Sequence, residues 1–232
     1  MNKYINYKNI DALFLDLDGT LINSEFAFCN SFINAFKIFD IVVTSEEYKT
    51  YELEQNNMLI DIKKKEFSKE LNGITKEDIL ALVYKDYTNR FKEVIIDNEA
   101  SYSFKLLKEL KQIGIKMALV TTCRALYLDI LFETYNVRDI FDFIVCRDDV
   151  LPSELKPSPT AYYMALNNLN VPIDNCLAIE DSKRGIDAAV GAGIRTIKVN
   201  NYTTIKFNDS RAFEEKSANE VFKKILMFKK WI

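Results

Sequence analysis

Residues 12–20 read ALFLDLDGT, and this is the most informative segment of the chain. Four apolar residues lead directly into Asp16, and Asp18, Gly19 and Thr20 follow. A short continuous apolar run that ends at a turn residue is typical of a strand buried on both faces of a parallel sheet. Polar side chains at the end of such a strand are expected where open parallel sheets bind their ligands.

The remainder of the chain alternates further apolar runs with helical patterns. The runs span residues 116–121, 141–146, 176–180 and 196–199, and the helical patterns lie near 101–113, 124–135, 159–168, 184–191 and 218–230. Near-continuous apolar strands separated by helices predict an α/β fold. We therefore expect a Rossmann-like parallel sheet core with helices on both of its faces.

The segment 24–98 differs from the rest because it contains almost no Gly or Pro and no strand-like run. Phe28, Phe32 and Phe36 recur every four residues, which predicts the buried stripe of an amphipathic helix. Thr75 begins a TKED capping-box pattern before another helical stretch. Residues 24–98 are therefore predicted to form an all-α insertion, and residues 1–23 and 99–232 to form the α/β core domain.

Composition excludes several functions. The 232 residues carry 31 basic and 34 acidic side chains, so a net charge of −3 gives no reason to expect nucleic acid or an anionic membrane as a partner. The absence of histidine rules out Ser-His-Asp triads and His-ligated zinc. Four scattered cysteines without a CxxC pair and no long apolar span predict a soluble cytoplasmic protein. The sequence leaves its oligomeric state open.

Polar residues also follow the other predicted strands. Thr121 and Thr122 end the second strand, Lys156 lies after the third, and Glu180 and Asp181 end the fourth. Each pair taken alone is typical of a turn or a helix cap. Four polar groups at the same end of successive strands, however, are expected to converge on one pocket.

The chemistry of that pocket follows from its residue types. Several close carboxylates repel one another unless a cation lies among them, and oxygen ligands without His or Cys favour Mg²⁺. Lys156 adds a positive charge and Thr121 a hydroxyl donor, so the same residues suit a phosphate group. The sequence predicts a magnesium and phosphate site.

These motifs together resemble the haloacid dehalogenase superfamily, and most closely its phosphoglycolate phosphatase and β-phosphoglucomutase branch. The matching motifs are DLDGT at 16–20, VTT at 120–122, KPSP at 156–159 and IEDSKRGIDAA at 179–189. The stretch 24–98 stands where that family inserts a helical cap domain.

The resemblance implies residue roles. Asp16 would be the nucleophile that attacks phosphorus, and Asp18 would protonate the leaving oxygen and then activate water. Lys156 and Thr121 would hold the phosphoryl group, and the backbone around Thr122 would contribute to its cradle. The implied phosphate-binding residues are thus Thr121, Thr122 and Lys156, and the implied metal ligands are Asp16, Asp18 (through its carbonyl), Asp181 and, in support, Glu180.

The favoured hypothesis is a Mg²⁺-dependent phosphatase acting on a small phosphorylated metabolite. The retained Asp18 supports it, because a leaving alkoxide needs a proton and a leaving halide does not. A phosphosugar mutase is the first alternative, but Phe28 stands where several relatives carry histidine. A phosphonatase would need a Schiff-base lysine, for which residues 63–65 are candidates. A non-catalytic binding protein is disfavoured because every motif residue is present.

Overall fold

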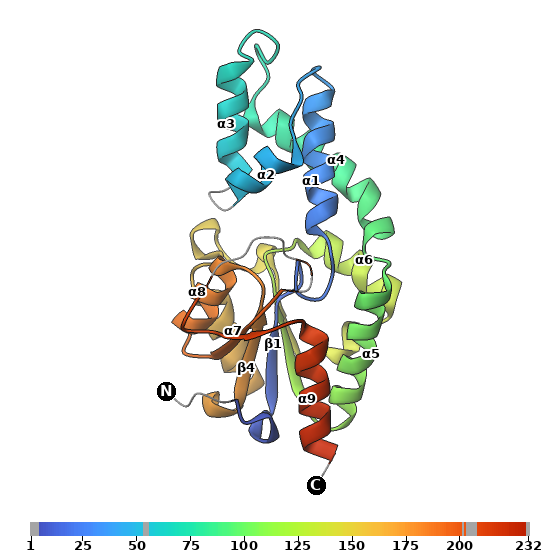
Figure 1. Ribbon diagram of the computed structural model, residues 1–232, viewed down its shortest axis with the longest axis vertical. Coiled ribbons are helices and arrows are strands. Elements are labelled where there is room, and N and C mark those ends of the chain that lie inside the picture. The colour runs from blue at the N-terminus through green and yellow to red at the C-terminus, as the bar shows by residue number, and fades with distance from the viewer. Residues whose placement is uncertain (1–4, 53–55, 201, 203–207, 231–232) are drawn as a thin grey trace. The chain divides into compact units, whose positions relative to one another are not determined.

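The computed structural model describes residues 5–52, 56–200, 202 and 208–230, and Figure 1 shows its elements. The chain separates into two compact units. The core unit comprises Met1–Asn23 and Ile95–Ile232, and the helical unit comprises Ser24–Val94. Each unit is described by itself below.

The core unit is built on a six-stranded sheet in the order β3-β2-β1-β4-β5-β6, and all neighbouring strands are parallel. The strands are β1 (Ala12–Leu15), β2 (Lys116–Val120), β3 (Phe143–Val145), β4 (Cys176–Glu180), β5 (Arg195–Val199) and β6 (Phe213–Glu215). β1 lies between β2 and β4, with Leu15 opposite Leu119 and Ile179. The strand order reverses at this position, which is where open sheets of this kind bind ligands.

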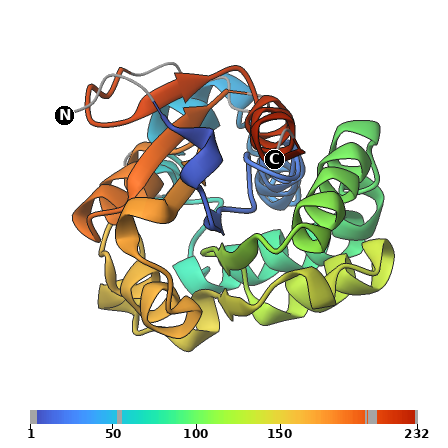
Figure 2. The same cartoon turned by 90° about the horizontal axis from the view of Figure 1, so that it is seen from below.

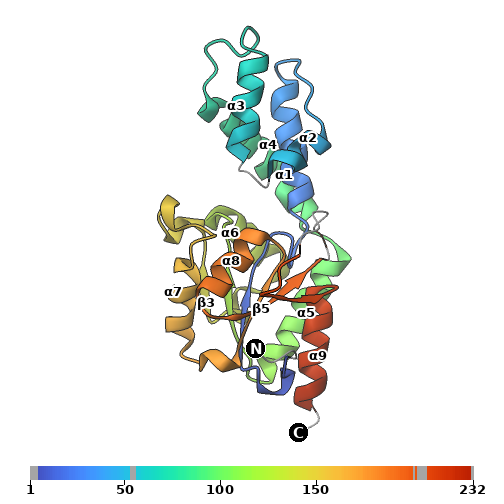
Figure 3. The ribbon, with the colours of Figure 1, turned by 60° about the vertical axis from the view of Figure 1, so that its left-hand side comes forward.

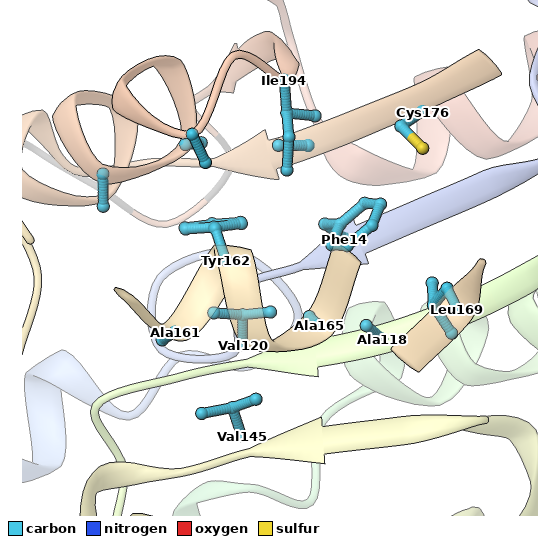
Figure 4. Close-up of a cluster of buried hydrophobic side chains, with 14 of the residues drawn as sticks. Phe14, Ala118, Val120, Val145, Ala161, Tyr162, Ala165, Leu169, Cys176 and Ile194 are labelled. Carbon is cyan, nitrogen blue, oxygen red and sulfur yellow. The ribbon is translucent and has the colours of Figure 1, made fainter. Parts of the chain in front are cut away.

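Helices cover both faces of this sheet, as Figures 2 and 3 show. One face carries α7 (Thr160–Leu169) and α8 (Lys183–Gly191), and the other carries α5 (Asn98–Gln112) and α9 (Ala218–Lys230), with α6 (Ala125–Tyr135) following β2. Under α7 and α8 lies a buried cluster that contains Phe14, Val120 and Tyr162 (Figure 4). The predicted α/β class with helices on both faces is confirmed.

The strand β6 was not predicted. It is three residues long, Phe213–Glu215, and none of its side chains is buried. It pairs with β5 at the edge of the sheet, where Ile197 lies opposite Phe213. A short edge strand of this kind has no continuous apolar run, so hydrophobic periodicity does not reveal it.

The helical unit contains α1 (Glu25–Lys37), α2 (Ser45–Glu52), α3 (Asn56–Glu66) and α4 (Lys76–Val94). Phe32 and Phe36 of α1 are fully buried in its core, as their spacing predicts. At the start of α4, the Thr75 hydroxyl accepts from the Asp78 N–H (3.1 Å), and the Asp78 carboxylate accepts from the Thr75 N–H (2.8 Å). This reciprocal cap is the one that the TKED pattern predicts.

Candidate active site

The turn after β1 presents the first carboxylates. Asp16 is buried, and its N–H donates to the Ile179 carbonyl of the neighbouring strand (3.1 Å). Gly19 has a φ of +81°, and a Cβ built on it would lie 2.0 Å from the Asp181 carboxylate. Only glycine therefore lets the turn come this close to the end of β4.

Lys156 is the central cation of the site. Its ammonium donates to Asp16 Oδ1 (2.6 Å), the Val120 carbonyl (2.8 Å) and Glu180 Oε1 (2.5 Å). These three acceptors match the three protons of an ammonium group. Burial lowers the pKa of Lys156, but the charges of Asp16 and Glu180 outweigh it and raise the pKa above its usual value. The lysine is therefore charged and fixed in place.

Glu180 lies at the end of β4 with no exposed surface. Its Oε1 accepts a second hydrogen bond, from the Tyr162 hydroxyl (2.6 Å). Its Oε2 faces α8, where a Cβ built on Gly185 would lie 1.9 Å from that oxygen. Burial, followed by the charge of Asp16, raises the pKa of Glu180 to about 7.

Asp16, Glu180 and Asp181 form a buried acidic cluster. One carboxylate oxygen from each lies within 4.8 Å of the others. Three carboxylates this close repel one another, and a single lysine offsets that repulsion only in part. The donor set is oxygen alone, so these residues fit a hard divalent cation such as Mg²⁺.

Asp18 and Thr121 lie beside this cluster. The Thr121 hydroxyl is 3.5 Å from Asp18 Oδ2 and accepts from the Cys123 N–H (3.0 Å). Asp18 is partly exposed, whereas Thr121 is buried. The Asp16 carboxylate has a hydroxyl partner as well, because Thr20 donates to its Oδ2 at 3.3 Å. The Asp16 carboxylate is thus held in the interior, whereas the Asp18 carboxylate is accessible to water.

The structure brings most of the predicted site residues together. Asp16 is linked through Lys156 to Glu180, and its carboxylate clusters with Asp181. Asp18 meets Thr121 through the contact given above. Thr122 differs because its side chain is exposed at the end of the second strand.

Two site residues were missed by the sequence analysis. Tyr162 lies in an apolar helical pattern, which indicates burial and no more. Arg184 lies one residue before Gly185, and its Nε (3.0 Å) and Nη2 both donate to the Lys156 carbonyl. Neither residue type carried a chemical signal at its position, because both contacts depend on how α7 and α8 pack.

A family model described as haloacid dehalogenase-like hydrolase matches residues 13–199. The chain belongs to this family. The resemblance drawn from the motifs is confirmed, and the chain is a haloacid dehalogenase-like hydrolase with a parallel-sheet core.

Relatives of this hydrolase include protein CbbY of Cereibacter sphaeroides, which is 32% identical over 200 residues, covering 81% of this chain and 83% of the relative. Pyrophosphatase PpaX of Bacillus mycoides is 25% identical over 193 residues, covering 82% of this chain and 83% of the relative. Both similarities agree with the assignment of the chain to the haloacid dehalogenase-like hydrolases.

Solved structures agree with the fold of the hydrolase. CbbY from Rhodobacter sphaeroides in complex with phosphate has a TM-score of 0.72 and 28% identity, covering 91% of this chain and 96% of that chain. A β-phosphoglucomutase from Clostridium difficile has a TM-score of 0.68 and 21% identity, covering 96% of this chain and 98% of that chain. The latter similarity supports the fold alone.

The helical unit of the hydrolase contains the residues on which two alternatives depended. Phe28 packs edge-on against the rings of Tyr84 (5.8 Å) and Tyr87 (5.2 Å), so it serves in packing. Lys63 is buried and bridges two glutamates. Burial lowers the pKa of Lys63, but hydrogen bonds to those glutamates outweigh it and raise the pKa. A protonated, paired amine is a poor Schiff-base nucleophile.

No helix within the described residues of the hydrolase is both long enough and apolar enough to cross a membrane.

Proposed function

We propose that this hydrolase is a Mg²⁺-dependent phosphatase that releases phosphate from a small phosphorylated metabolite through an aspartyl-phosphate intermediate on Asp16. The observation that carries the proposal is the position of Asp16, held by buried Lys156 and clustered with two further buried carboxylates. The solved CbbY complexes with phosphate and with xylulose-(1,5)bisphosphate support the substrate class.

The two oxygens of Asp16 have different roles in this mechanism. Oδ1 is fixed by Lys156 at 2.6 Å, whereas the contact that the described residues give Oδ2 is the longer one with Thr20, at 3.3 Å. We propose that Oδ2 attacks phosphorus, so that the Oδ2–P bond forms as the ester P–O bond breaks. Lys156 and Thr121 orient the phosphoryl oxygens, with the backbone at Thr122 in support.

Asp18 supplies the proton transfers. It is partly exposed, so it can exchange its proton with solvent, and it lies two residues from the nucleophile. In the first step the Asp18 carboxyl gives its proton to the leaving alkoxide. In the second step the Asp18 carboxylate takes a proton from water as that water attacks phosphorus, which breaks the Oδ2–P bond, frees phosphate and restores Asp16.

The acidic cluster is the proposed metal site. Asp16, Asp181 and the Asp18 carbonyl would hold Mg²⁺, with Glu180 in support because its Oε1 already accepts from Lys156. When bound, the ion offsets the negative charge of phosphate and carboxylates as they approach each other.

The main test is Asp16→Asn, assayed with an aryl phosphate and Mg²⁺. The amide is a poor nucleophile, so phosphate release is expected to fall at least about 1000-fold. Asp11→Asn is the matched control, since Asp11 precedes β1 at its opposite end, where it binds Asn175 and Lys229. Unchanged turnover in Asp16→Asn would contradict the proposal.

A screen of phosphorylated metabolites then separates the alternatives. Free phosphate as product supports a phosphatase, whereas an isomerised sugar phosphate would identify a mutase. We further propose that residues 24–98 act as a cap domain, in keeping with the family, and that the protein functions in the cytoplasm. The four cysteines are all free and buried, which suits that compartment.

A further inference from the structure

We propose that Tyr162 is a positioning residue for the nucleophile, acting through Glu180 and Lys156. This inference rests on the proposed function. It goes beyond it because Tyr162 lies outside the family motifs that were used to assign the site.

The hydroxyl and the ring of Tyr162 both lie close to charged residues of the site. Its hydroxyl donates to Glu180 Oε1 at 2.6 Å, and its ring centroid lies 5.4 Å from the Lys156 ammonium. The side chain has no exposed surface, and its ring lies 6.4 Å from that of Phe14. Tyr162 is therefore held by packing and contributes one directed proton.

The carboxylate of Glu180 receives its donors through one oxygen. Among the described residues Oε2 has no hydrogen-bond partner, because it is buried against Gly185. Oε1 therefore accepts from both Lys156 and Tyr162. A carboxylate oxygen has room for two donors, so the tyrosine shares the negative charge of Oε1 with the ammonium and weakens the hold of Glu180 on it.

This sharing determines where the Lys156 ammonium lies. With Tyr162 in place, the ammonium divides its protons between Glu180, Asp16 and the Val120 carbonyl. Without the hydroxyl, the ammonium is the donor that the described residues leave on Glu180, and the carboxylate draws it away from Asp16 Oδ1. The Asp16 carboxylate then loses the contact on Oδ1 that fixes the direction of its other oxygen, the attacking Oδ2.

The test compares Tyr162→Phe with Tyr163→Phe. Both changes remove one hydroxyl from α7, and the Tyr163 hydroxyl donates to the Gly191 carbonyl, outside the site. Because Tyr162 is not in contact with the substrate, kcat is expected to fall about tenfold while KM changes less than about twofold, as for one charge-assisted hydrogen bond. Tyr163→Phe is expected to leave both within about twofold.

A double-mutant cycle separates positioning from a merely structural role. In a Glu180→Gln background the tyrosine acts on a neutral partner, so Tyr162→Phe is expected to change kcat by less than about twofold. Equal effects of Tyr162→Phe in both backgrounds would overturn the proposal. Phenylalanine keeps the buried ring, and thermal unfolding of each variant verifies that it is folded.

A crystal structure of Tyr162→Phe gives a readout that does not depend on turnover. The distance from Lys156 Nζ to Asp16 Oδ1, 2.6 Å here, is expected to exceed about 3.2 Å in the variant. An unchanged distance would overturn the positioning role. An inactive wild-type enzyme with the expected shift would instead refute the proposed function alone.

Discussion

Each unit of the molecule contains a buried lysine that bridges two carboxylates. The side chain of Lys156 in the core unit is 5% exposed, and that of Lys63 in the helical unit is 6% exposed. The partners of Lys156 are buried as well, with Asp16 at 9% and Glu180 at 0% exposure.

The partners of Lys63 are solvated. Glu47 is 37% exposed and Glu66 is 50% exposed, so water stabilises their charge whether or not the lysine is present. The carboxylates around Lys156 lack this alternative, and they depend on the lysine and on the cation proposed above. The exposure of the carboxylates, more than that of the lysine, therefore distinguishes the proposed active site from the ion pairs of Lys63.

The largest effect is expected for Lys156→Met. The change leaves Asp16 and Glu180 buried without their cation, which is expected to cost about 3 kcal/mol of unfolding free energy. Phosphate release is expected to fall at least about 1000-fold, because the nucleophile is no longer oriented. Urea unfolding and steady-state kinetics measure the two effects, and turnover within tenfold of the wild type would end the distinction between the two lysines.

A smaller effect is expected for Arg184→Ala. Lys63 lies within α3, whereas Lys156 lies in a loop whose carbonyl is held by the exposed Arg184 guanidinium. Losing that contact is expected to lower kcat about fivefold, since one solvent-exposed anchor contributes about 1 kcal/mol. Lys183→Ala on the same helical turn, which breaks a contact with Asp187, is the control and is expected to have no effect.

For Lys63→Met we expect little loss of activity. Methionine fills the buried space, and the two glutamates turn to water, so the unfolding free energy is expected to fall by about 1 kcal/mol. Phosphate release is expected to stay within about threefold of the wild type. A loss of turnover without unfolding would instead revive a covalent role for this lysine.

The smallest effect concerns pH. The Glu47 carboxylate accepts a hydrogen bond from Lys63 and another from the Thr44 backbone N–H. These bonds, the first more than the second, lower the pKa of Glu47 below its usual value. The folded state therefore binds this proton less tightly than the unfolded state, and the resulting stability is present at neutral pH and lost as pH falls below about 4.5. The melting-temperature difference between wild type and Glu47→Gln, equivalent to about 0.5 kcal/mol at pH 7, is expected to vanish near pH 3. A melting-temperature difference that persists near pH 3 would show that Glu47→Gln acts through packing and not through the loss of charge.

The sequence predicted the sheet well because its central strands are continuous apolar runs. Cys176–Glu180 was predicted at its observed bounds. The first apolar run, predicted over residues 12–16, forms a strand over Ala12–Leu15, which is one residue shorter. The edge strand Phe213–Glu215 was missed because exposed strands lack such a run. Parallel order followed from the helices between strands, whereas the position of β6 depended on long-range pairing.

The charged residues of the site were predictable for a related reason. Asp16 and Glu180 stand at strand ends, and parallel strands bring such ends to one edge. Tyr162 was not predictable, because its spacing within α7 indicates only a buried face. The direction of its hydroxyl is set by the packing of that helix against β1, β2 and β3, which sequence periodicity does not encode.

The two close glycines have a consequence for mutational surveys of this enzyme. Gly19 faces the Asp181 carboxylate and Gly185 faces that of Glu180, each with too little space for one methyl group. A saturation scan is therefore expected to score both positions as intolerant as the acids that they face, although neither supplies a functional group. Screens that take intolerance to substitution as a sign of a catalytic side chain would count two extra active-site residues. The intolerance at these two positions would come from the close approach of the backbone to a carboxylate.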